Sequence, residues 1–144
     1  EELEAAKIQM QENVYMIDAR ILLAKIYINY ARSHLLDEAT EKSYNKEAVY
    51  HLMYAIDTDP KLSESYWLLL DLYRQEERWI NALDLVKQIE KNGIATTDQI
   101  IKFRVELYYH THRYDLLINE FKKMKDIPNV ENEWKKLSFW WGVT

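Results

Sequence analysis

The N-terminal third of the chain carries apolar residues at intervals that alternate between four and three. They are Ile17, Ile21, Ala24, Ile28, Ala31 and Leu35. Such spacing places side chains along one side of an α-helix. Further apolar residues between Leu22 and Tyr30 widen this stripe, so we expect the helix to be covered on more than one side. The acidic stretch 1–12, where apolar residues are sparse, is expected to form an exposed helical lead-in.

Short polar segments divide the rest of the chain into further helices. We expect these helices over residues 64–75, 79–91, 97–109 and 114–125, with a last one over 130–141. An earlier helix ends at the turn Asp57–Pro60, and Ser43 or Asn45 is a candidate for its N-cap. The pattern therefore predicts about seven helices joined by short loops.

Residues at the helix boundaries support this division. Ser63 is the candidate N-cap of the helix over 64–75. Thr96 and Gln99 have the spacing of a capping box, in which each residue satisfies a backbone N–H of the other. Gly93 ends the preceding helix, because glycine readily adopts the left-handed conformation that closes a helix C-terminus.

The sequence also repeats at an interval of 35 residues, which aligns the segment from Ser63 with the segment from Asp98. The aligned pairs are Tyr66 with Ile101, Tyr73 with Tyr108, Trp79 with Tyr114, Ala82 with Leu117, Val86 with Phe121 and Ile89 with Met124. A helical hairpin of about 34 residues cannot bury its apolar faces alone, so repeats of this length stack on their neighbours. Ala48 and Ala82 provide the small side chains that this stacking needs where helices cross.

Composition restricts the fold class. Only two glycines and two prolines occur among 144 residues, where average usage would give about ten and about seven. β-Sandwiches and barrels need these residues in their turns, and phosphate-binding loops need glycines, so folds of both kinds are excluded. The hydrophobic content of 48% is too high for a disordered chain. The sequence thus predicts an all-α protein.

Charge and cysteine content restrict the partners. The formal net charge is −5, with six basic and eleven acidic residues in 1–60 and thirteen of each in 61–144. An acidic chain repels a polyphosphate backbone, so nucleic acid is not an expected partner. The absence of cysteine excludes disulfides and thiolate catalysis, and it is compatible with both the cytoplasm and a bacterial periplasm, so the compartment stays open. No apolar run is long enough to span a bilayer, and the start at Glu1 leads us to expect an excised or processed piece.

Three segments resemble the tetratricopeptide repeat (TPR) family. Residues 44–60, YNKEAVYHLMYAIDTDP, resemble the second helix and terminal proline of such a repeat, and residues 63–93 resemble a nearly complete one. Residues 98–129 resemble a degenerate third repeat, with Leu117 where alanine is usual. The resemblance implies an α-α superhelix, a right-handed solenoid of antiparallel helix pairs, in a single domain over 1–144.

The resemblance further implies repeat boundaries and a binding groove. Repeat 1 covers about 17–62 with an insertion, repeat 2 covers 63–97, repeat 3 covers 98–129, and a C-terminal helix over 130–141 caps the array. In this family the first helices of the repeats line a concave groove that binds a partner protein or peptide. We therefore expect a non-catalytic binding module or scaffold within a larger protein or assembly. The matching groove positions are Trp67, Asp71, Arg74 and Gln75 in repeat 2, Lys102, Glu106, Tyr109 and His110 in repeat 3, and Ile21, Lys25 and Asn29 in repeat 1.

A second resemblance indicates a different partner. The segments ALDLVKQIEKNGIATTD and LLINEFKKMKDIPN are also similar to the helix ends of pentatricopeptide repeats, which bind single-stranded RNA one base per repeat. The positions that read bases in that family hold Trp67 and Lys102 here, and neither is a small hydrogen-bonding side chain. RNA binding therefore stays an alternative, which the acidic charge disfavours.

Patterns for catalysis or metal binding are weak. The four histidines, His34, His51, His110 and His112, lack the His-Glu-x-x-His spacing of a zinc site. His110 and His112 are expected in a turn between helices, and no serine lies in a G-x-S-x-G context. We therefore expect no enzymatic activity, no cofactor and no metal.

The C-terminal segment contains an unusual cluster of aromatic residues. Trp134 is followed by Phe139, Trp140 and Trp141. These side chains either cover the apolar face of the last repeat or anchor another chain, so a self-associating structural module is an alternative function. The five lysines among residues 122–136 are interpreted as a solvated helix face, with phosphate or anionic lipid as the alternative ligand.

The repeat predicts a specific effect of enlarging Ala82. We expect Ala82→Leu to overpack the helix crossing and to lower the free energy of unfolding by about 1–3 kcal/mol. Urea unfolding measures this change. An unchanged midpoint with an unchanged slope would show that Ala82 does not lie at a crossing.

Overall fold

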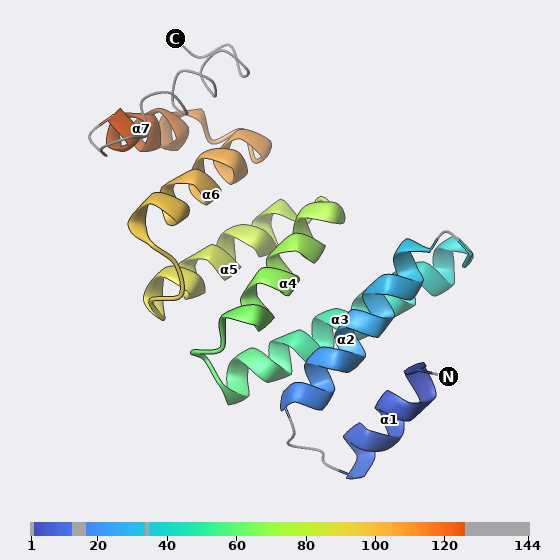
Figure 1. The fold of residues 1–144 in the computed structure, drawn as a ribbon. Coiled ribbons are helices and arrows are strands. Elements are labelled where there is room, and N and C mark those ends of the chain that lie inside the picture. The colour runs from blue at the N-terminus through green and yellow to red at the C-terminus, as the bar shows by residue number, and fades with distance from the viewer. Residues whose placement is uncertain (1, 13–16, 34, 126–144) are drawn as a thin grey trace. The chain divides into compact units, whose positions relative to one another are not determined.

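All regular structure in the part of the chain that the structure describes is helical. The computed structural model describes residues 2–12, 17–33 and 35–125 (Figure 1). The described residues form seven helices, of which six correspond to predicted helices and the first corresponds to the expected helical lead-in over 1–12. The predicted helix over 130–141 and the aromatic residues Phe139, Trp140 and Trp141 lie outside the described residues. The helices are α1 (Glu2–Glu12), α2 (Ile17–Arg32), α3 (Glu38–Thr58), α4 (Ser63–Gln75), α5 (Trp79–Lys91), α6 (Thr97–His110) and α7 (Tyr114–Lys125).

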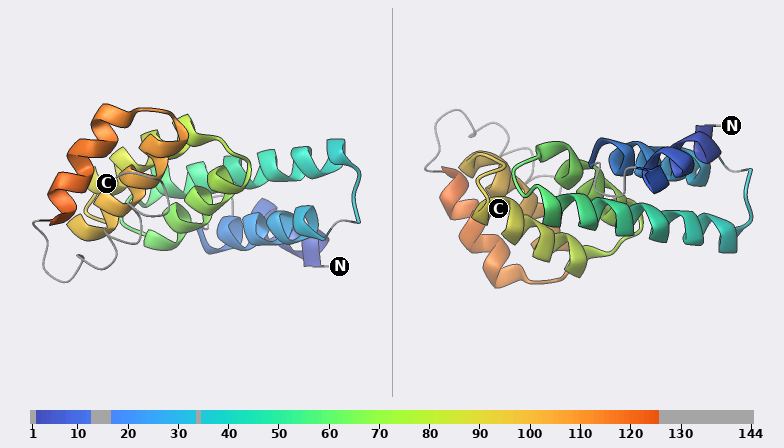
Figure 2. Two further views of the ribbon diagram at one scale, coloured as in Figure 1. Left: turned by 90° about the horizontal axis from the view of Figure 1, so that it is seen from above. Right: turned by 90° about the horizontal axis from the view of Figure 1, so that it is seen from below.

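The chain divides into two compact units between α4 and α5. Unit 1 comprises Glu1–Glu77, and unit 2 comprises Arg78–Thr144. In unit 1, α2 and α3 lie side by side as a hairpin with the most extensive helix contact, while α1 packs against α2 and α4 packs against α3 (Figures 1 and 2). In unit 2, α6 packs against both α5 and α7. The division falls within the predicted repeat 2 (63–97), and the repeat boundaries stay a prediction.

Small side chains occupy the core of unit 1. Ala24 of α2 and Ala48 and Ala55 of α3 are completely buried. Alanine allows two helix axes to approach to the short end of the usual range of about 8–10 Å. Leu52, which lies between the two alanines of α3, is also completely buried. The α2–α3 hairpin therefore combines small residues for close approach with a large one that fills the remaining space.

The loop between α3 and α4 is tied to the core by a tyrosine. The hydroxyl of the completely buried Tyr66 donates a hydrogen bond to the carbonyl oxygen of Pro60 at 2.8 Å. Because α3 continues through Thr58, the loop consists of residues 59–62 and begins later than the predicted turn Asp57–Pro60. This bond satisfies the polar end of a side chain whose ring is removed from water.

Two pairs of residues that lie 35 positions apart in the sequence repeat are buried alike in unit 2. Ala82 and Leu117, which are 35 residues apart, are both buried, and so are Val86 and Phe121. Each pair comes from α5 and α7, the second helices of the predicted repeats 2 and 3. The same positions therefore face the interior in both helices, although the side chains differ in size.

The helices α4 and α6 end in the same backbone conformation. Glu77 and His112, also 35 residues apart, have φ angles of 57° and 59°. The N–H of Glu77 donates to the carbonyl oxygen of Arg74, and that of His112 donates to the carbonyl oxygen of Tyr109, both at 3.2 Å. A left-handed residue closes many helix C-termini, and it costs an L-residue about 1–2 kcal/mol. The 35-residue interval of the sequence therefore also relates two backbone positions with a positive φ angle, Glu77 and His112.

The start of α3 differs from the prediction. This helix begins at Glu38, and Asp37 caps it by accepting a hydrogen bond from the N–H of Thr40 at 3.1 Å. Neither Ser43 nor Asn45 is the cap, because both lie inside the helix. Hydrogen bonding from Thr40 lowers the pKa of the Asp37 carboxyl below its usual value, since it stabilises the charged form.

Two further boundaries are corrected. Ser63 is the first residue of α4, and its predicted role as N-cap falls to Leu62, which makes no side-chain capping bond. The helix α2 ends at Arg32, so Leu35 lies beyond the apolar stripe and is 87% exposed.

The caps around α6 are confirmed. The side chain of Thr96 accepts a hydrogen bond from the N–H of Gln99 at 3.3 Å, and the side chain of Gln99 accepts one from the N–H of Thr96 at 3.0 Å. Gly93 has a φ of 66°, and the N–H of Ile94 donates to the carbonyl oxygen of Ile89 at 3.0 Å. The capping box and the helix end at Gly93 each depend on residues only a few positions apart, so both can be predicted from the sequence alone.

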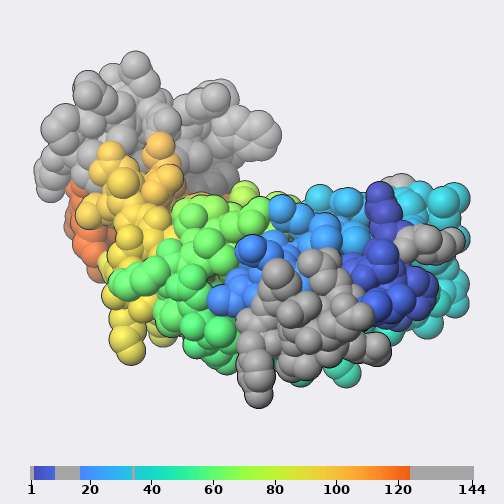
Figure 3. Space-filling model, turned by 60° about the horizontal axis from the view of Figure 1, so that its bottom comes forward, coloured from blue at the N-terminus to red at the C-terminus, as the bar shows by residue number. Residues whose placement is uncertain are grey.

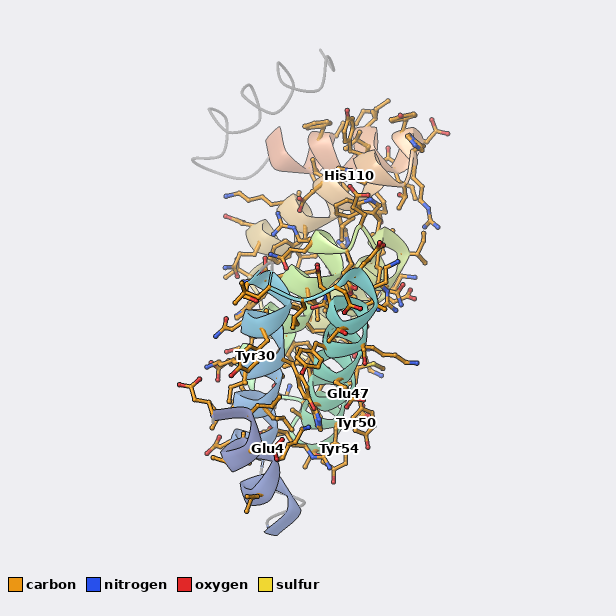
Figure 4. The ribbon with its side chains drawn as sticks, turned by 90° about the vertical axis from the view of Figure 1, so that its right-hand side faces the viewer. Glu4, Tyr30, Glu47, Tyr50, Tyr54 and His110 are labelled. Carbon is orange, nitrogen blue, oxygen red and sulfur yellow. The ribbon has the colours of Figure 1, made fainter. Side chains whose placement is uncertain are left out.

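Unit 1 contains a buried cation beside a buried histidine. Arg20 of α2 and His51 of α3 are each only 4% exposed, and Arg20 Nη1 lies 3.2 Å from His51 Nδ1. Arginine has no acceptor, so Nδ1 accepts and the ring is neutral with its proton on Nε2. The guanidinium also lies over the ring of Tyr54, 3.5 Å from its centroid. Figure 4 shows Glu47, Tyr50 and Tyr54 in succession along α3.

This arrangement lowers the pKa of His51. Burial is the larger cause, and the charge of Arg20 adds to it, whereas Glu47, with Oε2 3.8 Å from His51 Nε2, opposes the shift. The folded state therefore binds a proton on His51 less readily than the unfolded chain, whose pKa is about 6.5. Neutral His51 therefore stabilises the folded state fully at pH values above the pKa of the unfolded chain. This stabilisation is lost as the pH falls below that pKa towards the lower pKa of the folded state.

We predict that replacing His51 reduces the loss of stability in acid. Each unit of lowered pKa corresponds to about 1.4 kcal/mol at low pH, so wild-type protein should unfold at lower urea concentrations at pH 5 than at pH 7.5. His51→Gln keeps an acceptor for Arg20 and should show a smaller difference. The exposed His112, replaced by Asn, serves as control and should behave as wild type. An equal acid loss in His51→Gln would contradict this account.

Candidate functional site

Polar side chains from α2 and α4 lie next to one another on an exposed part of unit 1. We call this surface the α2–α4 face and define it by Lys25, Asn29 and Arg32 of α2 with Glu64, Leu68, Asp71 and Gln75 of α4. The three residues of α2 follow one another at intervals of four and three, so they share one side of the helix. The four residues of α4 do the same. In Figure 3 the atoms of α2 and α4 adjoin on the face shown.

Ion pairs connect the two helices across this face. Lys25 Nζ lies 2.6 Å from Glu64 Oε2, and Arg32 Nη2 lies 2.8 Å from Asp71 Oδ2. Arg32 Nε also donates a hydrogen bond to Gln75 Oε1 at 3.2 Å. All four ion-paired side chains are about half exposed, so each pair stabilises the fold by only about 0.2–1 kcal/mol. Such pairs can be exchanged for the charges of a partner at low cost.

Two hollows adjoin the ion pairs. The smaller, of about 190 Å³, is lined by Ile28 and Leu68 together with polar side chains of the α2–α4 face. The larger, of about 490 Å³, lies where Ala31 and Arg32 face Glu41 of α3 and the C-terminal end of α4. Arg32 lines both hollows. A surface that combines apolar floor and polar rim in this way can receive a side chain and hydrogen-bond the backbone beside it.

The structure brings together some of the predicted groove residues. Asp71 and Gln75 are both exposed and both contact Arg32. Arg74 is exposed on the same helix, and Trp67 is half-buried. These four residues come from the same helix, as the resemblance implied, and their role in binding stays a prediction.

The groove positions predicted in repeat 1 behave differently from one another. Lys25 is half-buried and Asn29 is exposed, and both lie on the α2–α4 face. Ile21 is buried, so its assignment to a groove is wrong, because its side chain belongs to the apolar core of unit 1. Sequence reasoning missed Arg32 and Glu64. The interval of seven residues between Lys25 and Arg32, which is two helical turns, was the available signal for Arg32.

The predicted groove residues of unit 2 lie on α6. Lys102 is exposed, whereas Glu106 and Tyr109 are half-buried. His110 is the last residue of α6 rather than part of the turn, and its ring stacks on that of Trp79 with centroids 3.9 Å apart. This stacking explains the aromatic residue at position 79 as a local packing partner of the α6 terminus.

The described ranges contain neither a metal-binding cluster nor a helix that could span a bilayer. Among residues 2–12, 17–33 and 35–125, no three His, Cys, Asp or Glu side chains are grouped so that they could hold a metal ion. In these same ranges no helix has both the length and the hydropathy of a bilayer-spanning segment.

Comparison with known proteins identifies the fold. No family model matches the sequence, and no curated protein matches it. The crystal structure of a thermophilic TPR protein from Thermus thermophilus matches 99% of this chain and 72% of its own, with a TM-score of 0.65 and 18% identity. At this identity the likeness concerns the fold. The chain has a TPR-like fold of helical repeats, which confirms the predicted all-α architecture and the resemblance to this family.

The exposed ion pair between Arg32 and Asp71 leads to a quantitative prediction. A double-mutant cycle with Arg32→Ala and Asp71→Ala should give a coupling energy of about 0.2–1 kcal/mol, which decreases as salt is added. Urea unfolding of the four proteins measures it. The pair Glu38 and Lys42, within a single helix and more exposed, is the matched control and should couple by about 0.3–0.5 kcal/mol. A coupling of zero for Arg32 and Asp71 would contradict the pairing across the α2–α4 face.

Proposed function

We propose that the chain is a non-catalytic protein-interaction module that binds an extended segment of a partner protein on the α2–α4 face. The observation that carries the proposal is the row of exposed, exchangeable ion pairs beside a hollow floored by Ile28 and Leu68. A TPR-like fold supports it, since helical repeats build extended binding surfaces from successive helices.

The chemistry of the face favours binding over catalysis. A general acid or base needs a carboxyl group whose burial or neighbours bring its pKa near the working pH. Glu64 and Asp71 are about half exposed, and each pairs with a cation. Both carboxylates are therefore suited to ionic contacts with a ligand rather than to proton transfer.

The charges of the face indicate which partner segment it fits. Lys25 and Arg32 provide positive charge on α2, and Glu64 and Asp71 provide negative charge on α4. A segment with charges of both signs and an apolar side chain between them would exchange these pairs without leaving an unpaired charge. In the wider proposal Trp67 contacts an apolar side chain of the partner, and Arg74 pairs with one of its carboxylates. The module would act as a scaffold within a larger protein or assembly.

Site-specific cross-linking tests the proposal. We predict that a photo-reactive phenylalanine analogue at Asn29 captures a discrete partner protein in cells. The same analogue at the exposed Met53 of α3, which lines neither hollow, should not capture it. Adding Leu68→Glu to the Asn29 variant should abolish the adduct, because a charge then occupies the apolar floor.

The outcomes distinguish the alternatives. Equal adducts from both positions, or none from Asn29, would contradict binding at the α2–α4 face. An adduct with the chain itself would support the self-associating module, and an adduct with RNA would support the pentatricopeptide-like alternative. A circular dichroism spectrum of Leu68→Glu that matches wild type excludes unfolding as the cause of the loss.

A further inference from the structure

Unit 2 contains a groove that the proposed function does not use. It has a volume of about 420 Å³ and is lined by α5, α6 and α7. We call it the α5–α7 groove. Four cationic side chains border it, namely Lys87, Arg104, Arg113 and Lys123. The apolar side chains Leu83, Val86 and Leu116 line it as well. The groove is thus both basic and apolar, in a chain whose net charge is −5.

A buried carboxylate organises two of these cations. Glu120 is only 4% exposed, and its Oε1 lies 3.3 Å from Lys123 Nζ and 3.8 Å from Arg104 Nη1. Its other oxygen, Oε2, is buried and makes no hydrogen bond with any described residue. A carboxylate removed from water in this way needs compensating positive charge, so Glu120 holds Lys123 and Arg104 at the groove.

The charges that border the groove do not balance. Arg104 also forms an ion pair with Glu90, so Glu90 and Glu120 neutralise two of the four positive charges. Lys87 and Arg113 are exposed and form no ion pair with any residue in the described part of the chain. Two positive charges therefore remain available to a ligand.

The spacing along α7 suggests the form of that ligand. Leu116, Glu120 and Lys123 of α7 follow one another at intervals of four and three, which places them along one side of the helix, and Arg113 immediately precedes the helix. Leu116, which is 43% exposed, follows Arg113 by three residues, so an exposed apolar side chain lies close in sequence to one of the two cations that form no ion pair with any described residue.

We propose that the α5–α7 groove binds an acidic peptide segment of a partner protein that carries two carboxylates and an apolar side chain. Lys87 and Arg113 pair with the carboxylates. Leu116, the exposed apolar residue of the lining, contacts the apolar side chain. Glu120 keeps Arg104 and Lys123 in place and repels ligands of denser negative charge. The proposal is independent of the α2–α4 face, since no residue is shared between the two surfaces.

The mixed lining favours a peptide over a simple anion or a nucleic acid. Inorganic phosphate would use the cations and leave the exposed side chain of Leu116 in water. A nucleic acid would bring many more negative charges than the two that are unbalanced here, against an acidic chain. An acidic peptide with an apolar residue uses both kinds of lining.

Fluorescence polarisation with the full chain tests the proposal at about 150 mM salt, where weak long-range attraction is screened. The probe is a labelled peptide of sequence Asp-Glu-Leu-Asp-Glu. The reversal Arg113→Glu should weaken its binding about tenfold or more, because a charge-assisted contact is replaced by repulsion. Lys122→Glu makes the same charge change on α7 outside the groove lining and should change affinity less than about twofold. Lys87→Glu and its control Lys91→Glu repeat the comparison on α5, so the test does not depend on one variant folding.

Each result decides for or against the groove. A probe in which serine replaces leucine should bind at least severalfold more weakly, and inorganic phosphate at millimolar concentration should not displace the acidic probe. If groove variants and control variants lost affinity for the probe equally, the probe would be bound by general charge attraction rather than at the groove, and the proposal would be overturned. Unchanged binding of the serine probe together with displacement by phosphate would identify a simple anion site and overturn it too. Absence of binding to wild-type protein would do the same. Arg32→Ala should leave the affinity for the probe unchanged, so failure of this proposal and failure of the α2–α4 face are separately recognised.

Discussion

Close packing between neighbouring helices is the constraint on which the rest of this structure depends. A hairpin of two short helices has too little apolar surface to be stable alone, and each helix must therefore be covered by more than one neighbour. In unit 1 this coverage requires alanine at positions 24, 48 and 55, where a longer side chain would separate the helices. In unit 2 the corresponding buried positions hold Ala82 and Leu117, so the fold accepts different sizes when the surroundings adjust. Helices held this closely on two sides expose only their remaining side chains, and these form the surfaces available for binding.

The same packing determines which polar groups enter the interior. Arg20 and His51 are buried because they occupy core-facing positions on α2 and α3, and their mutual contact together with the ring of Tyr54 replaces the water they lose. Glu120 is buried in unit 2 with Arg104 and Lys123 beside it. Buried charge is an inefficient source of stability, since desolvation offsets most of the attraction. Its effect here is geometric. In unit 1 it fixes a neutral histidine in one tautomer, and in unit 2 it fixes two cations at the edge of a groove.

The sequence predicted those features that depend on neighbouring residues. The helix spans follow from the apolar spacing, and the capping box of Thr96 and Gln99 and the left-handed Gly93 follow from residues at most a few positions apart. The start of α3 was misplaced because several polar residues in succession can each cap a helix, and only the backbone decides that Asp37 does so. Contacts between distant residues were not predictable. Arg20 and His51 are 31 residues apart, and Arg32 and Asp71 are 39 apart, so their pairing depends on how the helices pack. For the same reason the resemblance predicted Asp71 and Gln75 as groove residues but did not indicate Arg32, which forms hydrogen bonds with both.

The two candidate surfaces differ in a way that follows from their charges. On the α2–α4 face every cation has an anion opposite it, so the surface has no net charge of its own, and a ligand must exchange one ion pair for another. Exchanging ion pairs in this way contributes little affinity. Its main effect is to disfavour ligands whose positive and negative charges do not match the order of charges on the α2–α4 face. In the α5–α7 groove two cations have no counterpart among the described residues, so an acidic ligand gains pairing without first breaking any. Under the two proposals, the first surface therefore selects a ligand by the order of its charges, and the second selects a ligand by the sign of its charge. Both surfaces use helices that the fold already requires for its own stability.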